Sequence, residues 1–198
     1  MKASRRMSTK KLVMGAILTA LVVVLQFLAL VYRALLPMAP FTISLVLVPI
    51  VLGAALCDTR VSGWLGFVFG VIVLFTDAGA FLAINMPATV LVVLVKGTAA
   101  GLAAGLVYSL LEKKNRYLAT VTAAVVCPVV NTGIFLLGCR LFFFETIKSW
   151  GLAGGFDNAL AYMILGLVGL NFLIEVGLNL VLSPSILRLV NIRKKAAE

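Results

Sequence analysis

The sequence predicts an all-α integral membrane protein: one bundle of six transmembrane helices, with the N- and C-termini in the cytoplasm. Of its 198 residues, 63% are hydrophobic and 12% are charged, and the mean hydropathy is +1.16. Soluble domains are about half apolar and a quarter charged, so this chain has too little polar surface to coat a water-soluble globule. Thirteen of its seventeen Lys and Arg residues lie in four places, which long uncharged stretches separate.

The four basic places predict the orientation of the chain. Positively charged loops are retained on the cytoplasmic face of a membrane, and six crossings put both termini on one side. The net charge of +10 does not indicate nucleic-acid binding, because the basic residues flank apolar stretches and form no continuous face. In chain order the basic residues are Lys2, Arg5, Arg6, Lys10 and Lys11; Arg60; Lys113, Lys114 and Arg116; and Arg188, Arg193, Lys194 and Lys195.

Six apolar stretches approach the length of about 20 residues that a transmembrane helix needs. Pro87 suits the first turn of the fourth helix, whereas Pro184 predicts a break or bend late in the sixth, because proline removes a backbone donor. The first stretch follows a basic start but has no small-residue cleavage site, so we interpret it as a retained span. The predicted spans are residues 12–32, 41–57, 61–76, 87–111, 118–141 and 159–190, and residues 142–158 form the longest outer loop.

The chain carries no recognisable metal, cofactor or nucleotide motif. It has no histidine, and Cys57, Cys127 and Cys139 show no paired spacing, so we expect no metal site and interpret the cysteines as apolar packing residues. No phosphate-binding loop is present, so an ATPase that drives uphill transport must be another chain. Lys96, Glu175 and Asp77 are able in principle to act in acid–base catalysis, but no carboxylate dyad, metal set or nucleophile–base pair accompanies them. An intramembrane enzyme is therefore an alternative function that no catalytic motif in the sequence supports.

Small residues recur at four-residue spacing on three predicted helices. Such faces let helices approach closely in lipid, where apolar side chains gain little by meeting each other. Ala16 and Ala20 on the first helix suit either internal packing or docking of a partner. A scaffold protein whose small-residue faces bind other membrane proteins is therefore an alternative function. We interpret the glycine faces of the third and fourth helices as packing within the chain; they comprise Gly66, Gly70, Gly97, Gly101 and Gly105.

Polar side chains from three predicted spans lie at similar depth, near the middle of the bilayer. Lys96, Asn131 and Asn171 each lie roughly 14–18 Å from the outer end of their span, at about 1.5 Å per residue. On the sixth span Asn171, Glu175 and Asn179 follow one another at four-residue spacing and share one face. A charge at mid-membrane costs at least about 2.5–3.5 kcal/mol and is usually retained for function. The pattern predicts a polar pocket for a small solute, with a structural Lys96–Glu175 ion pair as the alternative.

Two further residues near the outer ends of the spans are candidates for substrate contact. Arg140, like Asp77, is also able to reach lipid headgroups or water. Trp150 and the phenylalanine run at 142–144 suit either an interfacial aromatic belt or a lid over the pocket, and the outer-loop glycines are compatible with a mobile lid. The predicted substrate-binding residues are Lys96, Asn131, Asn171, Glu175, Asn179, Arg140 and Trp150.

Five short motifs follow one another along the chain. They are MGAILTAL at 14–21, ISLVLVPIVLG at 43–53, GWLGFVFG at 63–70, LVKG at 94–97 and CPVVNTG at 127–133. In this order, and with this chain length and six-span layout, the sequence resembles the substrate-specific S component of energy-coupling factor (ECF) transporters, the vitamin importers of bacteria and archaea. The resemblance covers nearly the whole chain.

The resemblance implies a mechanism and a set of partners. Such a subunit sits in the cell membrane, captures a B-vitamin or related small metabolite from outside, and delivers it with a transmembrane coupling protein and two cytoplasmic ATPases. Ala16 and Ala20 would dock the coupling protein. The pocket would open outward beneath the loop between the first two spans, with the last three spans contributing contacts. The chain lacks the histidine and tryptophans of thiamine-specific members, and Glu175 stands where a riboflavin binder would carry lysine, so the substrate is left open.

Overall fold

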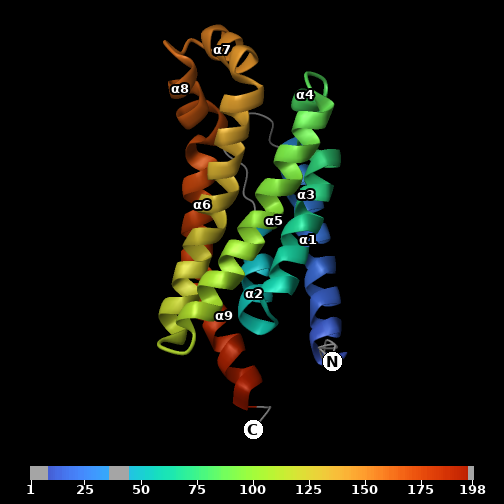
Figure 1. The fold of residues 1–198 in the computed structure, drawn as a ribbon, viewed down its shortest axis with the longest axis vertical. Helices are drawn as coiled ribbons and strands as arrows, with labels where there is room; N and C mark the ends of the chain where they lie inside the picture. Colours follow the sequence, from blue (N-terminus) through green and yellow to red (C-terminus); the bar gives the residue numbers. More distant parts are fainter. Residues whose placement is uncertain (1–8, 36–44, 196–198) are drawn as a thin grey trace, which may run out of the picture.

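The computed structural model describes residues 9–35 and 45–195, and every regular element in these two ranges is a helix (Figure 1). In chain order the elements are α1 (Thr9–Leu35), α2 (Leu47–Leu56), α3 (Thr59–Thr76), α4 (Gly79–Leu82), α5 (Met86–Leu111), α6 (Arg116–Phe142), α7 (Phe144–Ala153), α8 (Ala159–Ala161), the π-helical segment η1 (Tyr162–Val168) and α9 (Gly169–Lys195). Five segments of the described chain are long and apolar enough to cross a membrane: α1, α3, α5, α6 and residues 159–192. The predictions that concern Lys2, Arg5, Arg6 and residues 36–44, with the start of the second span, lie outside the described residues.

A short helix, α2, represents the second predicted span. It has ten residues, or about 15 Å of helix, whereas the hydrocarbon core is about 30 Å thick. By length and composition the described chain therefore supports five crossings, and the predicted count of six is not confirmed. Seven of the ten residues of α2 are buried, so this helix belongs to the core of the bundle.

α1 and α3 lie side by side and run in the same direction. Near the beginning of α1, Lys11 Nζ lies 3.1 Å from a carboxylate oxygen of Asp58, the residue before α3. Near the end of α1, Arg33 forms a salt bridge with Asp77, the residue after α3. Two parallel neighbours require the chain to return between them, and α2 forms part of that return.

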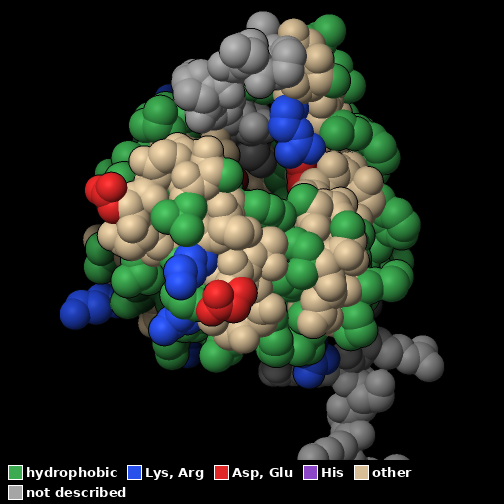
Figure 2. Space-filling view, turned by 90° about the horizontal axis from the view of Figure 1, so that it is seen from above, with side chains coloured by type: hydrophobic (Ala, Val, Ile, Leu, Met, Phe, Trp, Pro, Cys, Tyr) green, Lys and Arg blue, Asp and Glu red, His purple; other side chains and the backbone are tan. Residues whose placement is uncertain are grey.

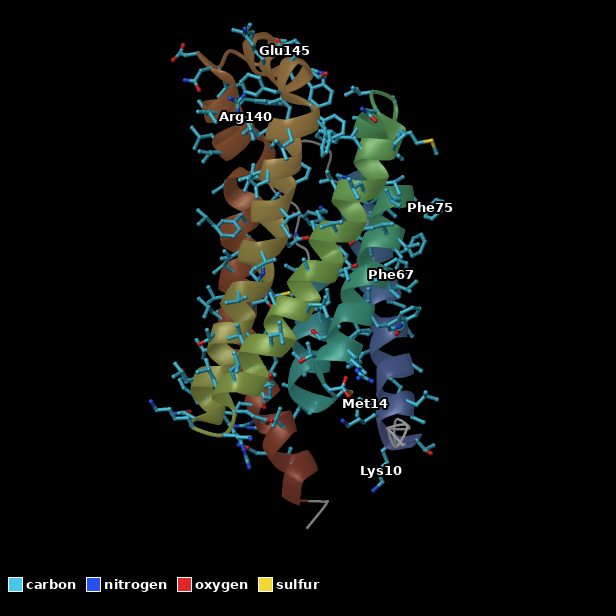
Figure 3. The ribbon with its side chains drawn as sticks, viewed as in Figure 1. Lys10, Met14, Phe67, Phe75, Arg140 and Glu145 are labelled. Atoms are coloured by element: carbon cyan, nitrogen blue, oxygen red, sulfur yellow. The ribbon has the colours of Figure 1, made fainter. Side chains whose placement is uncertain are left out.

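The beginning of α1 and the end of α9 lie at one end of the bundle, and α4, α7 and α8 lie at the opposite end (Figure 1). We call these the lower end and the upper end. Figure 3 places Lys10 and Met14 near the lower end and Arg140 and Glu145 at the upper end. The cytoplasmic orientation of the lower end stays a prediction, which rests on the positions of the basic residues.

α3 and α5 pack against each other through glycines. A Cβ atom at Gly66 would lie 2.0 Å from the carbonyl oxygen of Gly97, and a Cβ at Gly97 would lie 2.3 Å from the carbonyl oxygen of Gly66. A Cβ at Gly101 would lie 2.1 Å from the carbonyl oxygen of Ser62. The two backbones therefore touch with no side chain between them. This confirms the predicted packing role of the glycine faces, and it fixes the position of α5, which carries Lys96.

The sixth predicted span, residues 159–190, is interrupted at a different place from the one predicted. It consists of α8, η1 and α9, and Gly169, where α9 begins, has a φ angle of +35°. α9 continues through Pro184, so the helix does not break at that proline, and a bend there stays a prediction. One missing backbone donor is tolerated in a transmembrane helix whose neighbours pack around it. The wider π-helical turn and the positive φ, which favours glycine, interrupt the span nearer the upper end instead.

The longest predicted outer loop, residues 142–158, is mostly helical. α7 occupies its middle, and Ile147 and Gly151 on this helix are buried. Ile147 packs in a hydrophobic cluster with Cys139, Phe143 and Met163, which come from the upper parts of the last two spans. The segment connects the fifth and sixth predicted spans, and its helical conformation was not predicted, because the buried face of α7 is too short to stand out from sequence alone.

Asp58 caps α3 at the lower end. Its side chain accepts a hydrogen bond of 3.0 Å from the backbone N–H of Val61 and pairs with Lys11. Partial burial opposes ionisation of the carboxyl group, but these hydrogen bonds and the charge of Lys11 outweigh it, so the pKa of Asp58 lies below its ordinary value of 3.8. Because the pKa is lower in the folded state than in the unfolded state, this stabilisation is complete above the ordinary pKa and is lost as the pH falls through the folded-state pKa.

We expect Asp58→Ala to lower the free energy of unfolding by about 1 kcal/mol, the usual cost of losing a helix N-cap. Asp58→Asn keeps an acceptor for the Val61 N–H but removes the charge, so it should retain most of the stability at neutral pH. It should also lose less stability than the wild type when the pH is lowered below the ordinary pKa of aspartate. Thermal unfolding of the three detergent-purified proteins at neutral and acidic pH measures both effects, and equal stability of Asp58→Ala and wild type would contradict the capping role.

Candidate functional site

Four of the predicted substrate-binding residues line one cavity in the bundle: Lys96, Asn131, Asn171 and Glu175. Its lining comes from α1, α3, α5, α6, η1 and α9, and its volume is about 240 Å³. We call it the polar cavity. Pockets for drug-sized molecules usually measure about 300–1,000 Å³, so the polar cavity lies just below this range and suits only a small solute. Lys96 lies about ten residues from the start of α5, or roughly 15 Å below the upper end of that helix.

Lys96 and Glu175 both face the polar cavity, and neither forms a salt bridge with a described residue. The Nζ atom of Lys96 lies 5.0 Å from the centre of the Phe135 ring, a cation–π contact. Within the described ranges the structure contains two salt bridges, Lys11–Asp58 and Arg33–Asp77, and neither involves these two residues. The structural alternative of a direct Lys96–Glu175 ion pair is therefore not present, and both charges are available to a bound solute.

Asn131 presents an unsatisfied acceptor to the same cavity. Its side chain is 6% exposed, and its Oδ1 atom has no hydrogen-bond partner among the described residues. Buried polar atoms are nearly always paired, and leaving one unpaired costs about 1–3 kcal/mol. Because Asn131 lines the polar cavity, a donor group of a bound solute would satisfy it.

The mouth of the polar cavity carries a salt bridge between Arg33 and Asp77, whose side chains are 44% and 29% exposed. Gln26 donates hydrogen bonds to the carboxylate of Asp77 and, at 3.1 Å, to the hydroxyl of Thr76. Figure 2, which views the upper end, shows basic and acidic side chains together at a hollow between hydrophobic surfaces. This salt bridge joins the end of α1 to the end of α3. Lys96 and Glu175 are the other two charged residues of the cavity lining, and neither takes part in a salt bridge in the described part of the chain.

Sequence reasoning missed the contribution of α1 to the cavity. Gln26 and Arg33 both line it, and Gln26 is 5% exposed. A signal was present, because Gln26 is the one polar side chain between Thr19 and Tyr32 in an otherwise apolar stretch. An isolated amide inside a span is a candidate for function by the same reasoning that selected Asn131.

A second, smaller cavity of about 130 Å³ adjoins the polar cavity, and the two share Lys96, Asp77, Val73 and Phe135 in their linings. We call it the aromatic cavity. The Phe81 ring in its wall makes edge-to-face contacts with Phe135, Phe143 and Trp150, at centroid distances of 5.7, 5.1 and 5.5 Å. Lys96 therefore lies where a polar compartment meets an apolar, aromatic one.

The other three predicted substrate-binding residues line neither cavity. The Arg140 guanidinium stacks on the Phe144 ring, 3.8 Å from its centre, and Trp150 packs against Phe81. Asn179 is 1% exposed and donates a hydrogen bond of 2.8 Å to the backbone carbonyl of Glu175. Asn179 shares a helix face with Glu175 but lies one turn lower, where core side chains replace the cavity. Substrate contact by these three residues stays a prediction.

The part of the cavity wall that the last span supplies is irregular. Leu167 and Val168 come from the end of η1, whereas Asn171 and Glu175 come from α9. π-helical turns occur frequently at functional sites, and interrupted transmembrane helices form binding sites where their backbone faces a cavity. The interruption at Gly169 therefore lies within the wall of the site.

Ala16 and Ala20 lie on the outside of the bundle. Both are exposed, and they line a mostly apolar groove of about 700 Å³ between α1 and the first turns of α3. Trp64 forms one wall of the groove and donates a hydrogen bond of 3.2 Å to the hydroxyl of Thr19. Neither side chain is covered by the rest of the described chain, which favours docking over internal packing, and docking stays a prediction.

The cysteines have the packing role that the sequence predicts. Cys127 and Cys139 are 0% and 1% exposed and are free thiols, and the partly buried Cys57 packs against the main hydrophobic cluster. Within the part of the chain that the structure describes, no group of three or more His, Cys, Asp and Glu side chains is arranged to hold a metal ion.

A helical membrane bundle that encloses a partly polar cavity has the architecture expected of a membrane protein that binds a small solute. The chain belongs to the family of substrate-specific components of ECF transporters: the family model described as "ECF transporter, substrate-specific component" matches residues 10–187. It is therefore a multi-pass membrane subunit for substrate-specific transport, as its sequence motifs indicate. No curated protein matches the chain, and no solved structure matches it.

Proposed function

We propose that the protein captures a small, polar, vitamin-like metabolite from outside a bacterial or archaeal cell. It then delivers this metabolite together with a transmembrane coupling protein and two cytoplasmic ATPases. One observation carries the proposal: Lys96, Asn131 and Glu175, from three different helices, line a single cavity inside a membrane protein. Ionic and amide groups at this depth are costly and are usually retained for function. A bound solute with complementary groups gives them that function.

The distribution of charge supports capture from outside. The cavity has its mouth at the upper end, where Arg33 and Asp77 pair. Most basic residues between or beside the spans belong to the lower end, including Lys11, Lys113 and Lys114. Basic segments stay in the cytoplasm, so the lower end is cytoplasmic in this proposal and the cavity opens to the exterior.

Identification of a retained small molecule tests the proposal. The protein is expressed in rich medium, purified in detergent, washed and denatured, and the extract is analysed by mass spectrometry. We expect one compound at roughly one molecule per protein. A Lys96→Ala/Glu175→Ala double variant of the same purity, which should retain none, distinguishes a bound solute from carried-over medium. A washed wild-type protein that yields no compound above the level of the double variant would favour the scaffold alternative.

The groove at Ala16 and Ala20 supports docking of the coupling protein in this proposal. The groove is apolar, lies on the outside of the bundle, and is flanked by the basic residues Lys11 and Arg60 at its lower end. Small side chains let a partner helix approach the α1 backbone closely, which is how helices associate in lipid.

We expect Ala20→Trp to reduce recovery of the coupling protein and ATPases in co-purification by at least about tenfold, which corresponds to ~1.4 kcal/mol. The indole would fill the groove and hold a partner helix away from α1. The amount of retained small molecule should not change, because Ala20 is remote from the polar cavity. Val181→Trp, at a lipid-facing position on α9 that is 74% exposed, is the matched control and should assemble normally. Normal assembly of Ala20→Trp would contradict docking at this groove.

A further inference from the structure

The charges that line the polar cavity balance in number but not in pairing. Arg33, Asp77, Lys96 and Glu175 are its four charged residues. Arg33 and Asp77 neutralise each other at the mouth. Lys96, on α5, and Glu175, on α9, remain as one cation and one anion that make no salt bridge with each other or with any other described residue. The interior of the cavity therefore presents one basic and one acidic side chain that are not joined in a salt bridge.

The separation of Lys96 from Glu175 is maintained by contacts of the protein itself. The Lys96 ammonium lies over the face of the Phe135 ring, a contact that partly offsets the loss of water. Asn179, one turn further along α9, is buried and donates its hydrogen bond to the backbone carbonyl of Glu175 within the same helix, so the Glu175 side chain is left facing the cavity. Two opposite charges away from water attract each other strongly. Because Lys96 and Glu175 do not meet in a salt bridge, a charged group of a ligand is able to bind to each of them.

The charge sign of the ligand follows from the cost of an unmatched buried charge. A ligand with only an anionic group would pair with Lys96 and bury Glu175 without a partner, and a ligand with only a cationic group would do the reverse. Breaking or omitting one side of a buried ion pair is strongly unfavourable. A ligand that carries both signs satisfies both side chains, and an N–H donor on its cationic group would also satisfy the free Oδ1 of Asn131.

The aromatic cavity defines the remaining part of the ligand. It meets the polar cavity at Lys96, Asp77, Val73 and Phe135. Beyond this junction its wall is mostly apolar and includes Phe81 and Phe143, with Thr89 as the one hydroxyl-bearing side chain in the lining. An anionic group at Lys96 would therefore sit at the junction, with an apolar or aromatic part on one side of it and the cationic group on the other.

We propose that the substrate is a small zwitterion, with an anionic group bound at Lys96, a cationic group bound at Glu175 and Asn131, and an apolar or aromatic part in the aromatic cavity. This inference rests on the proposed capture of a solute, and it specifies the chemical class of that solute.

The test uses the full-length, detergent-purified protein and the compound that it retains after washing. Tandem mass spectrometry and electrophoretic mobility at acidic and alkaline pH determine the ionisable groups of this compound. A compound with both an anionic and a cationic group is the expected result. A retained compound that is uncharged or carries groups of one sign would overturn the inference and leave the proposed capture function intact. The absence of any retained compound would remove the capture function and this inference with it.

Matched variants test the two contacts separately. We expect Lys96→Met and Glu175→Gln each to reduce the retained compound at least tenfold, while the protein still elutes as a single species from a sizing column. Lys148→Met and Glu145→Gln make the same chemical changes at exposed positions on α7 and should retain the compound at the wild-type level. Wild-type retention by either cavity variant would show that the corresponding charge does not contact the ligand, and would overturn the inference.

Discussion

Replacing Gly97 with alanine is expected to destabilise the bundle by about 3 kcal/mol or more, although it adds only one methyl group. That carbon would lie 2.3 Å from the carbonyl oxygen of Gly66 and 3.3 Å from the backbone nitrogen of Gly70. Overpacking usually costs about 1–3 kcal/mol. Here the obstructing atoms are backbone atoms of α3, so no side chain is able to rotate away and the two helices must separate.

Gly177→Ala is the matched control for this prediction. A Cβ at Gly177, which also lies inside a long helix, would have no neighbour within 4 Å. Alanine in a helix interior is favoured over glycine by roughly 0.5–1 kcal/mol, so this variant should be as stable as the wild type or slightly more stable. Thermal unfolding in detergent compares the two variants, which should shift in opposite directions. An unchanged midpoint for Gly97→Ala would contradict the direct contact between the α3 and α5 backbones.

Gly97→Ala should also weaken ligand retention, although Gly97 does not line either cavity. Its neighbour Lys96 stands where the polar and aromatic cavities meet, and a shift of α5 away from α3 displaces this side chain. The contact between α3 and α5 therefore connects the packing of the bundle to the geometry of the site.

The second large effect is expected for Lys96→Ala and Glu175→Ala, each of which should lower ligand affinity by about a hundredfold or more. Removing one side of a buried charge pair costs about 2–5 kcal/mol, and each 1.4 kcal/mol is about a tenfold change in affinity. The protein should still fold, because neither residue takes part in a salt bridge within the described chain. The ligand-free variants should even be as stable as the wild type or more stable, since an unpaired buried charge has been removed.

Two measurements on each variant check this prediction: the amount of retained small molecule and the thermal midpoint of the emptied protein. Asp77→Ala is an informative comparison, because it breaks the salt bridge with Arg33 and removes an acceptor of the buried Gln26 amide. It should therefore lower stability, unlike the Lys96 and Glu175 variants. Unchanged retention in both Lys96→Ala and Glu175→Ala would rule out the polar cavity as the binding site.

The depth of polar residues along each predicted span was sufficient to find the main part of the cavity lining. Lys96, Asn131, Asn171 and Glu175 come from three different helices, α5, α6 and α9, and line one cavity. Depth is readable from sequence because the rise per residue of a helix is constant. The rotation of each helix about its axis cannot be read from the sequence, because it depends on contacts with the other helices. Asn179 shows the difference: it continues the polar stripe of α9 but packs in the core.

The sequence by itself determined the membrane class, the long spans and the glycine contact between the third and fourth of them. These follow from the length of apolar stretches, which the thickness of the bilayer dictates, and from the spacing of small residues. The predicted fourth and fifth spans, 87–111 and 118–141, agree with α5 and α6 to within two residues at each end.

Only the tertiary structure decided how the last span is interrupted, which residues of α1 reach the cavity, and whether Lys96 and Glu175 pair. Each of these depends on atoms that are distant in sequence: the Phe135 ring beneath the Lys96 ammonium, Arg33 against Asp77, and the packing of α7 on η1. Hydropathy records how apolar a segment is and contains no information about such partners. The physical reason for this difference is that hydropathy is a property of each residue by itself, whereas a binding site depends on how several helices are positioned relative to one another.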